Sequence, residues 1–231
     1  MFREGLLIFA RRCRKGEKLA FPGLVGSLAR MMLKLAAAPA FALVLAACAS
    51  APEGPANLPF AEGLAAACGK AFEGRVVSDD AVDDEWRENR LVVHVRDCEP
   101  GVFRMPLSVG EDRSRTWVLT ATGENGGWEL RHVHRHEDGG LDALTDYGGF
   151  SVSDPSAARQ EFPADQATKD LFDKEGIPVS KTNVWAVEMR SADQVLAYEL
   201  KRPERFFRVE IDLSKPVEIP PPHWAPPAPP M

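Results

Sequence analysis

The sequence predicts a mainly β fold: an antiparallel meander of about eight or nine strands that forms a barrel or sandwich, with one internal helix. Three observations predict it. Apolar and polar residues alternate in short segments, most clearly in 184–190, 195–202 and 205–213. Short links join these three segments, which makes them antiparallel neighbours. Helical periodicity inside the domain is clearest in one segment, 165–176,.

The alternation begins after a short Ala-rich segment, 60–70, which we expect to be a helix that ends at Gly69,. The expected strands then follow at short intervals. They are 72–78, 90–97, 102–109, 117–122, 128–136, 141–147, 150–153, 184–190, 195–202 and 205–213,. Segment 79–88 is expected to be a solvated acidic loop, and Asn125–Gly126 predicts a tight hairpin turn. Strands in such a row leave sheet edges, which a barrel or sandwich hides.

The internal helix has signals at both ends. Asp165 is its expected N-cap, and Gly176 is its expected C-terminal stop before Pro178,. Gly148–Gly149 is expected to break the preceding strand region,. One late helix beside a β-meander is similar to the lipocalin-like arrangement, and this resemblance is one of layout only.

The N-terminal part has the pattern of an export signal. An apolar run, 35–47, follows Lys34, and it is shorter than the ~20 residues that span a bilayer,. It ends in Leu45–Ala46–Ala47–Cys48, which resembles the lipobox of bacterial lipoproteins. The resemblance implies a signal peptide over 1–47 and a lipid on Cys48 that attaches the protein to a membrane. Because Ala49 stands where Asp would hold a Gram-negative lipoprotein at the inner membrane, it implies the periplasmic face of the outer membrane.

Residues 1–30 fit this signal poorly because they hold a run of basic residues after a short apolar patch. Met31 or Met32 would give a compact start, and we expect translation to begin there. The predicted organisation after the signal peptide is a lipidated tether with a short helix at 48–70, an antiparallel β domain at 71–215, and a Pro-rich tail at 216–231.

The chain is acidic, with a net charge of −6. Segment 1–47 holds eight Lys/Arg and two Asp/Glu, so its removal leaves a net charge of −12. This balance argues against nucleic acid and anionic lipid surfaces as partners. The expected membrane contact is therefore the N-terminal lipid.

Two cysteines remain once Cys48 carries a lipid. In an exported domain, Cys68 and Cys98 are most simply paired in a disulfide,. A redox or metal role is the less favoured alternative, because their spacing is not CxxC.

The segment with the most chemistry is the expected strand 128–136. With a period of two, Trp128, Leu130, His132, His134 and His136 share one face, and the Trp–Leu beginning marks that face as the inward one,. We expect this row to line the interior of the barrel. The favoured hypothesis is a small-ligand cavity formed by Trp128, His132, His134, His136 and Tyr147.

The alternative is a metal site that holds zinc or copper. Same-face residues two apart on a strand lie about 6.7 Å apart and residues four apart about 13 Å, so two neighbouring histidines can share one ion but all three cannot. A three-residue loop at 138–140 would bring Asp142 and Asp146 onto the histidine face as partners. A two-residue turn at 138–139 would instead bring Leu141, Ala143, Thr145 and Tyr147. The two-residue turn is favoured, because it brings more apolar residues onto the histidine face. No catalytic residue is predicted, since no G-x-S-x-G and no free Cys is present in the domain.

The tail, 216–231, contains eight prolines. Such a segment is neither strand nor helix and is expected to be an extended polyproline chain, most simply a disordered end. The alternative is that it docks on an envelope partner with His223 and Trp224 as anchors. The sequence thus leaves three functions open: a ligand-binding or accessory lipoprotein, a metal-dependent hydrolase or metal-handling protein, and an adaptor that acts through its tail.

Overall fold

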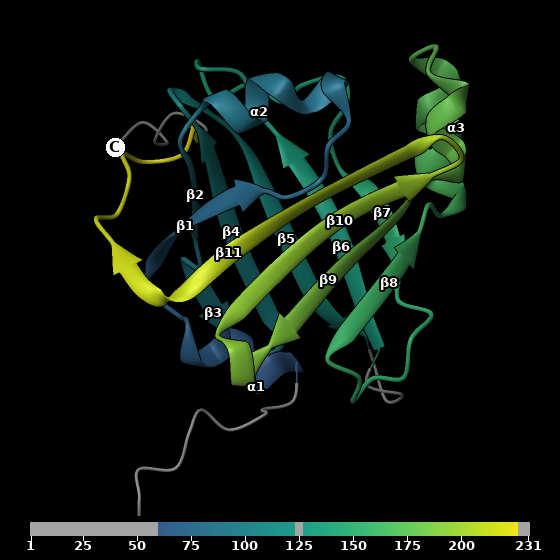
Figure 1. The fold of residues 1–231 in the computed structure, drawn as a ribbon. Helices are drawn as coiled ribbons and strands as arrows, with labels where there is room; N and C mark the ends of the chain where they lie inside the picture. The colour runs from purple at the N-terminus through teal and green to yellow at the C-terminus, as the bar shows by residue number, and fades with distance from the viewer. Residues whose placement is uncertain (1–59, 123–126, 226–231) are drawn as a thin grey trace, which may run out of the picture. The chain divides into compact units, whose positions relative to one another are not determined.

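The computed structural model describes residues 60–122 and 127–225, all of which belong to one compact unit, Ala49–Met231. Their strands form one antiparallel sheet with neighbours in the order β7-β6-β5-β4-β2-β1-β11-β10-β9-β8, and β3 pairs with β4 (Figure 1). The strands are β1 Ala71–Val76, β2 Leu91–His94, β3 Asp97–Glu99, β4 Val102–Val109, β5 Asp112–Thr122, β6 Gly127–His134, β7 Tyr147–Phe150, β8 Arg159–Pro163, β9 Val184–Arg190, β10 Val195–Arg202 and β11 Arg205–Val217. The predicted fold class, a mainly β antiparallel meander, is confirmed.

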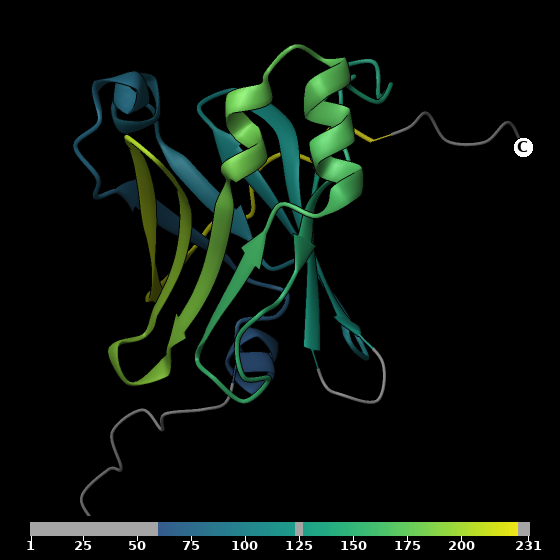
Figure 2. The ribbon, with the colours of Figure 1, turned by 90° about the vertical axis from the view of Figure 1, so that its right-hand side faces the viewer.

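The helices lie at the two ends of the curled sheet. They are α1 Phe60–Ala66, η1 Ala81–Asp83, α2 Asp84–Glu88, α3 Gln166–Lys174, η2 Pro178–Thr182 and η3 Ser191–Asp193. Figure 1 shows α1 at one end and α2 with α3 at the other, and Figure 2 shows α3 beside η2 at that same end. We call the end that carries α2 the mouth of the barrel.

The core lies inside the curled sheet and follows the alternation of the sequence. In β9, Trp185, Val187 and Met189 are buried, and in β11, Val209 and Ile211 are buried. Phe60 of α1 is also buried and meets Trp128 edge to face, with ring centroids 5.3 Å apart. Burial of such side chains is the main stabilising contribution, at roughly 25 cal/mol per Å² of apolar surface. The end of the barrel that carries α1 is therefore filled by apolar packing.

The sheet is nearly closed, because its first and last strands in the pairing order come together. The backbone N–H of Val152 donates to the carbonyl of Glu161 (2.9 Å), and that of Asp165 donates to the carbonyl of Gly148 (3.1 Å). Gly149 makes this approach possible, since a Cβ there would lie 1.9 Å from the carbonyl oxygen of Pro163, and Gly148 lies equally close to β6, where a Cβ would be 1.8 Å from the carbonyl oxygen of Leu130. The expectation that these glycines break a strand is wrong: they form the middle of β7.

One further expectation about the strands is wrong, and one strand was missed. Of the expected strand 141–147, only Tyr147 lies in a strand, β7, and Leu141 makes an isolated bridge to Arg135. Strand β8 was not predicted, because its inward residue Gln160 is polar although it is fully buried. The Gln160 amide donates to the carbonyls of Asp154 (2.8 Å) and Ala157 (2.9 Å), so its burial leaves that donor group satisfied,.

The two expected helices are found at the predicted places in the chain, as α1 and α3. The side chain of Asp165 accepts a hydrogen bond from the backbone N–H of Thr168 (2.8 Å), and Gly176 adopts a positive φ of 73° after α3,. Gly69, with φ 75°, follows α1. Cys68 and Cys98 are joined in a disulfide that links the turn after α1 to β3, with the Cα atoms 6.2 Å apart.

The tail differs from the expected disordered end over the part that the structure describes. Strand β11 continues through Pro216, which pairs with Phe72. Farther along, the N–H of Trp224 donates to the carbonyl of Arg113 (3.3 Å), and the Arg113 guanidinium donates to the carbonyl of Pro222 (3.3 Å). Residues 218–225 thus lie against the outer face of the sheet of their own chain.

Several predictions lie outside the described residues. They are the signal peptide and start site in 1–47, the lipidated Cys48, the tether up to residue 59, the hairpin turn at 123–126 and the end of the tail at 226–231. Among the helices that the structure does describe, none has both the length and the apolar character needed to cross a bilayer.

Candidate functional site

The histidines of β6 lie on the inward face of the sheet, as the alternation requires. Strand β6 pairs with β5 so that His132 lies opposite Trp117 and Leu130 opposite Leu119. Trp117, Leu119, Leu130 and His132 are all buried. The outward residue Arg131 instead binds the carboxylate of Asp165 (2.6 Å).

His132 is fixed within the core. It is 3% exposed, and its Nδ1–H donates to the carbonyl of Tyr147 (3.1 Å) while its Nε2 accepts from the hydroxyl of Tyr198 (2.8 Å). Its ring is stacked on Tyr147 with centroids 4.7 Å apart. Burial lowers the pKa of His132 to about 3, so the ring is neutral at neutral pH,. Both nitrogens are occupied, which makes this histidine a structural group.

His134 lies one step nearer the mouth and is partly exposed. Its Nε2 shares a hydrogen bond with the hydroxyl of Tyr147 (3.2 Å). Burial, followed by the nearby Arg115 guanidinium, lowers the pKa of His134 to about 4. Burial also raises the pKa of Tyr147 to about 12, so its hydroxyl keeps its proton. His134 is therefore a neutral hydrogen-bonding group at the surface of a pocket.

That pocket has a volume of about 160 Å³ and lies at the mouth of the barrel. Its walls come from β5, β6, β7, β10, β11 and the η1–α2 segment. The lining residues are Asp83, Trp86, Arg115, Trp117, His132, His134, Tyr147, Tyr198, Leu200, Arg205 and Phe207. Trp117 and Tyr198 stack with centroids 4.2 Å apart, and Trp86 meets Phe207 edge to face at 5.1 Å. We call this feature the mouth pocket.

The charged groups of the mouth pocket are paired. The Arg205 guanidinium donates to both oxygens of Asp83 (2.7 and 2.5 Å), and Asp83 is 3% exposed. Arg115 pairs with Asp112 and lies over the ring of Trp86, 5.2 Å from its centroid. The expectation that 79–88 is a solvated acidic loop holds only in part. Asp79, Asp84 and Glu85 are exposed, but Asp83 is buried against Arg205, and the segment forms η1 and α2 instead of a loop.

The other predicted site residues do not line the mouth pocket. Trp128 packs at the opposite end, against Phe60 and Phe103, and does not line the mouth pocket. The side chain of His136 is 60% exposed, with Nε2 3.7 Å from Asp142. Asp146 lies in a loop and its N–H donates to the carbonyl of His132 (2.7 Å). Across the described residues, no three His, Cys, Asp or Glu side chains gather as metal ligands.

The turn after β6 follows neither of the two expected registers. The N–H of Gly139 donates to the carbonyl of His136 (2.9 Å), and Arg135 pairs with Leu141. Residues 142–146 then form a loop, after which Tyr147 pairs directly with His132. Tyr147 thus reaches the histidine face as expected, although by another register.

Eight of the eleven residues that line the mouth pocket were not among the predicted site residues, and four of them show why. Tyr198 and Phe207 alternate inward in their strands, so that pattern could have placed them in the interior but not beside the histidines. Trp86 and Arg205 carried no signal, because their contact with the pocket depends on a pairing of Asp83 and Arg205 across 122 residues.

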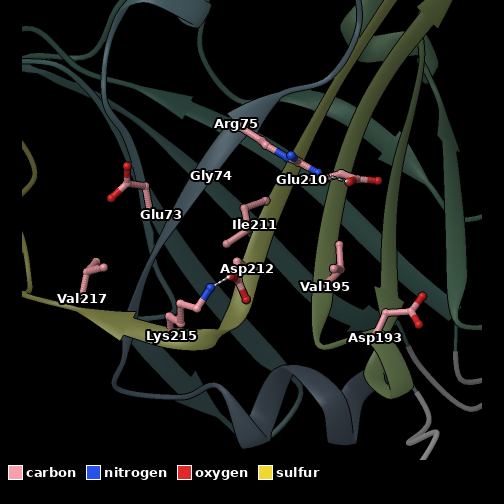
Figure 3. Close-up of a pocket in the computed structure, with 10 residues that line it drawn as sticks. All are labelled: Glu73, Gly74, Arg75, Asp193, Val195, Glu210, Ile211, Asp212, Lys215 and Val217. Atoms are coloured by element: carbon pink, nitrogen blue, oxygen red, sulfur yellow. Dashed lines mark ion pairs between the residues drawn. The ribbon is translucent and has the colours of Figure 1, made fainter.

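A larger depression, of about 610 Å³, lies where the pairing of β1 and β11 shifts between Phe72 and Gly74 (Figure 3). Four of its six charged side chains pair with one another: Arg75 lies 3.6 Å from Glu210, and Lys215 lies 3.3 Å from Asp212. It contains no aromatic ring and no histidine. The mouth pocket is therefore the better candidate for a site.

The comparisons with known proteins add no assignment, because the chain has no significant match to a family model, to a curated protein or to a solved structure. The function is therefore argued from the geometry of the mouth pocket and from the pattern of the N-terminal segment.

Proposed function

We propose that this protein is a lipid-anchored binding protein of the bacterial cell envelope, held at the periplasmic face of the outer membrane, which takes a small planar ligand in the mouth pocket. The observation that carries the ligand proposal is the set of aromatic rings around His134 in a pocket of 160 Å³. A cavity of roughly 150 Å³ is enough for one benzene ring. The ligand is therefore about one ring in size.

The paired charges of the pocket indicate a ligand without a net charge. Asp83 balances Arg205, and Asp112 balances Arg115. A charged ligand would have to displace one of these pairs, which costs free energy. A neutral ring can stack on Trp117 or Tyr198 and offer one polar substituent to His134. Phenols are simple members of this class.

Binding of a phenol is tested with 4-fluorophenol by fluorine NMR. We expect the wild-type protein to broaden the fluorine signal and unlabelled phenol to restore it. Leu200→Phe should weaken binding about tenfold, because Leu200 lines the pocket and a phenyl ring there occupies its volume,. The control is Leu141→Phe, since Leu141 is 58% exposed and outside the pocket. Equal binding by both variants, or no broadening by the wild type, would contradict the proposal.

The same experiment has an expected pH dependence. The pKa of His134 is lowered to about 4, so its ring remains neutral between pH 5.5 and 7.5. The broadening should therefore be the same at both pH values. A loss of binding with a midpoint near the ordinary histidine pKa of about 6.5 would argue against His134 as the polar contact.

Membrane attachment is supported by the resemblance of Leu45–Ala46–Ala47–Cys48 to a lipobox. We expect Cys48→Ser to move the protein from the membrane fraction to the soluble fraction, because the thiol that would carry the lipid is lost. Cys13→Ser is the matched control, since Cys13 precedes the expected start at Met31 or Met32. If both variants stay in the membrane fraction, the lipid anchor is wrong.

A further inference from the structure

A second pocket lies on the outer face of the barrel, where the tail crosses the sheet. It has a volume of about 270 Å³ and is independent of the mouth pocket. Its lining residues are Arg96, Arg104, Thr116, Val118, Val133, Arg135, His223, Trp224 and Ala225. We call it the tail pocket.

The sheet register explains why these side chains meet. Arg104 of β4 pairs with Val118 of β5, and Thr116 of β5 pairs with Val133 of β6. In each of these strands the neighbouring residues, such as Met105, Trp117 and His132, point into the core. Arg104, Thr116, Val118 and Val133 therefore share the outer face, and the tail passes over them.

The tail is held there by specific contacts. The imidazole of His223 lies 3.1 Å from the hydroxyl of Thr116, measured from Nε2. Burial lowers the pKa of His223, so its ring adds a wall and a hydrogen-bonding group but no charge at neutral pH. Trp224 is held through its backbone by Arg113. The tail thus completes the pocket instead of merely lying near it.

The tail pocket is rich in positive charge although the chain is acidic overall. Arg96 pairs with Asp97 (2.7 Å), and Arg104 lies 3.6 Å from Glu99. Within the described part of the chain, Arg135 forms no ion pair with a carboxylate, and its guanidinium donates to the carbonyl of Gly139 (2.9 Å). Three guanidinium groups therefore face one pocket with two carboxylates to balance them. The net charge of the chain predicted no anionic partner, because a net charge does not show a local excess of positive charge such as this one.

We propose that the tail pocket binds a phosphate group, with Arg96, Arg104 and Arg135 as its charged donors. A guanidinium offers a planar set of N–H donors that fits phosphate oxygens, and a phosphate group has enough oxygens for several such donors. Val118, Val133 and the ring of Trp224 give the pocket an apolar side as well. The ligand is therefore a phosphate that carries an apolar group, either a soluble phosphate ester or the headgroup of an anionic lipid.

Phosphate binding is tested on the full chain by phosphorus NMR with inorganic phosphate, which isolates the charged part of the recognition. We expect line broadening that saturates with wild-type protein and an affinity about tenfold lower for Arg135→Gln, as is typical of losing one charge-assisted hydrogen bond. The matched control is Arg75→Gln, because the Arg75 side chain is 78% exposed and lies on β1, outside the tail pocket. Circular dichroism of each variant verifies folding.

The source of the phosphate is decided by co-sedimentation with vesicles. If the wild type sediments with vesicles that contain phosphatidic acid but not with pure phosphatidylcholine, and Arg135→Gln does not, the ligand is a lipid headgroup. If phosphate binds in solution and the vesicles do not, the ligand is a soluble phosphate ester. The proposal is overturned if inorganic phosphate does not bind, or if Arg75→Gln weakens binding as much as Arg135→Gln does.

Discussion

Gly149→Ala is expected to lower the free energy of unfolding by about 3 kcal/mol or more, one of the largest effects of any single substitution in this barrel. A Cβ on Gly149 would lie 1.9 Å from the carbonyl oxygen of Pro163, which is a backbone atom that cannot move alone. The substitution would therefore push β7 away from the end of β8, at the point where the sheet closes.

The effect is measured by urea unfolding at equilibrium, with Gly140→Ala as the control. A Cβ on Gly140 would lie 3.0 Å from the side-chain oxygen of Asp138, which is exposed and can rotate away. We expect this control to change stability by about 1 kcal/mol or less. If the two variants unfold at the same urea concentration, β7 and β8 do not meet as closely as described.

Acidification is expected to destabilise the protein through His132. The pKa of this group is lowered to about 3 in the folded state by burial, against about 6.5 in the unfolded chain,. The unfolded state therefore takes up the proton first, and stability falls as the pH drops from 6.5 towards 3. It is constant with respect to this group above about pH 7.5. Between pH 7.5 and 4.5 the loss is about 3 kcal/mol.

His132→Gln tests this by removing the ionisable group while keeping a polar side chain. Its free energy of unfolding should decline less between pH 7.5 and 4.5 than that of the wild type, even if it is less stable at pH 7.5. His136→Gln is the control, because the His136 ring is largely exposed and makes no contact in the core. An equal decline in the wild type and His132→Gln would show that the buried imidazole is not the cause. The carboxylates titrate mainly at lower pH and affect both proteins alike.

The sequence predicts those parts of the fold in which the buried residues are apolar and the exposed residues are polar. Segments 184–190 and 195–202 match β9 and β10 residue for residue, because each has one apolar face. The same rule placed His132 and His134 inward. It failed for β8, where the buried Gln160 satisfies its polar groups by local hydrogen bonds and so looks like a loop residue.

The rest of the site depends on contacts between distant parts of the chain. Alternation tells which way Tyr198 points, but not that its hydroxyl meets His132 across 66 residues. Likewise, the sequence does not distinguish Asp83 from its exposed acidic neighbours, because its burial depends on its pairing with the distant Arg205. The tail is a similar case. Its prolines predict disorder, and the contact of His223 with Thr116 that holds it on the sheet cannot be seen in the sequence.

The imidazoles of His132 and His134 lie inside the barrel, neutral and hydrogen-bonded, beside a pocket that we propose to hold one small ring. Proton–nitrogen NMR correlations of the histidine side chains between pH 8 and 4 test it most directly. We expect His132 to keep a proton on Nδ1 alone throughout this range, because burial lowers its pKa to about 3, and His134 to begin to take up a second proton only near pH 4. If both rings become doubly protonated near pH 6.5, they stand in water, and the mouth pocket does not exist as described.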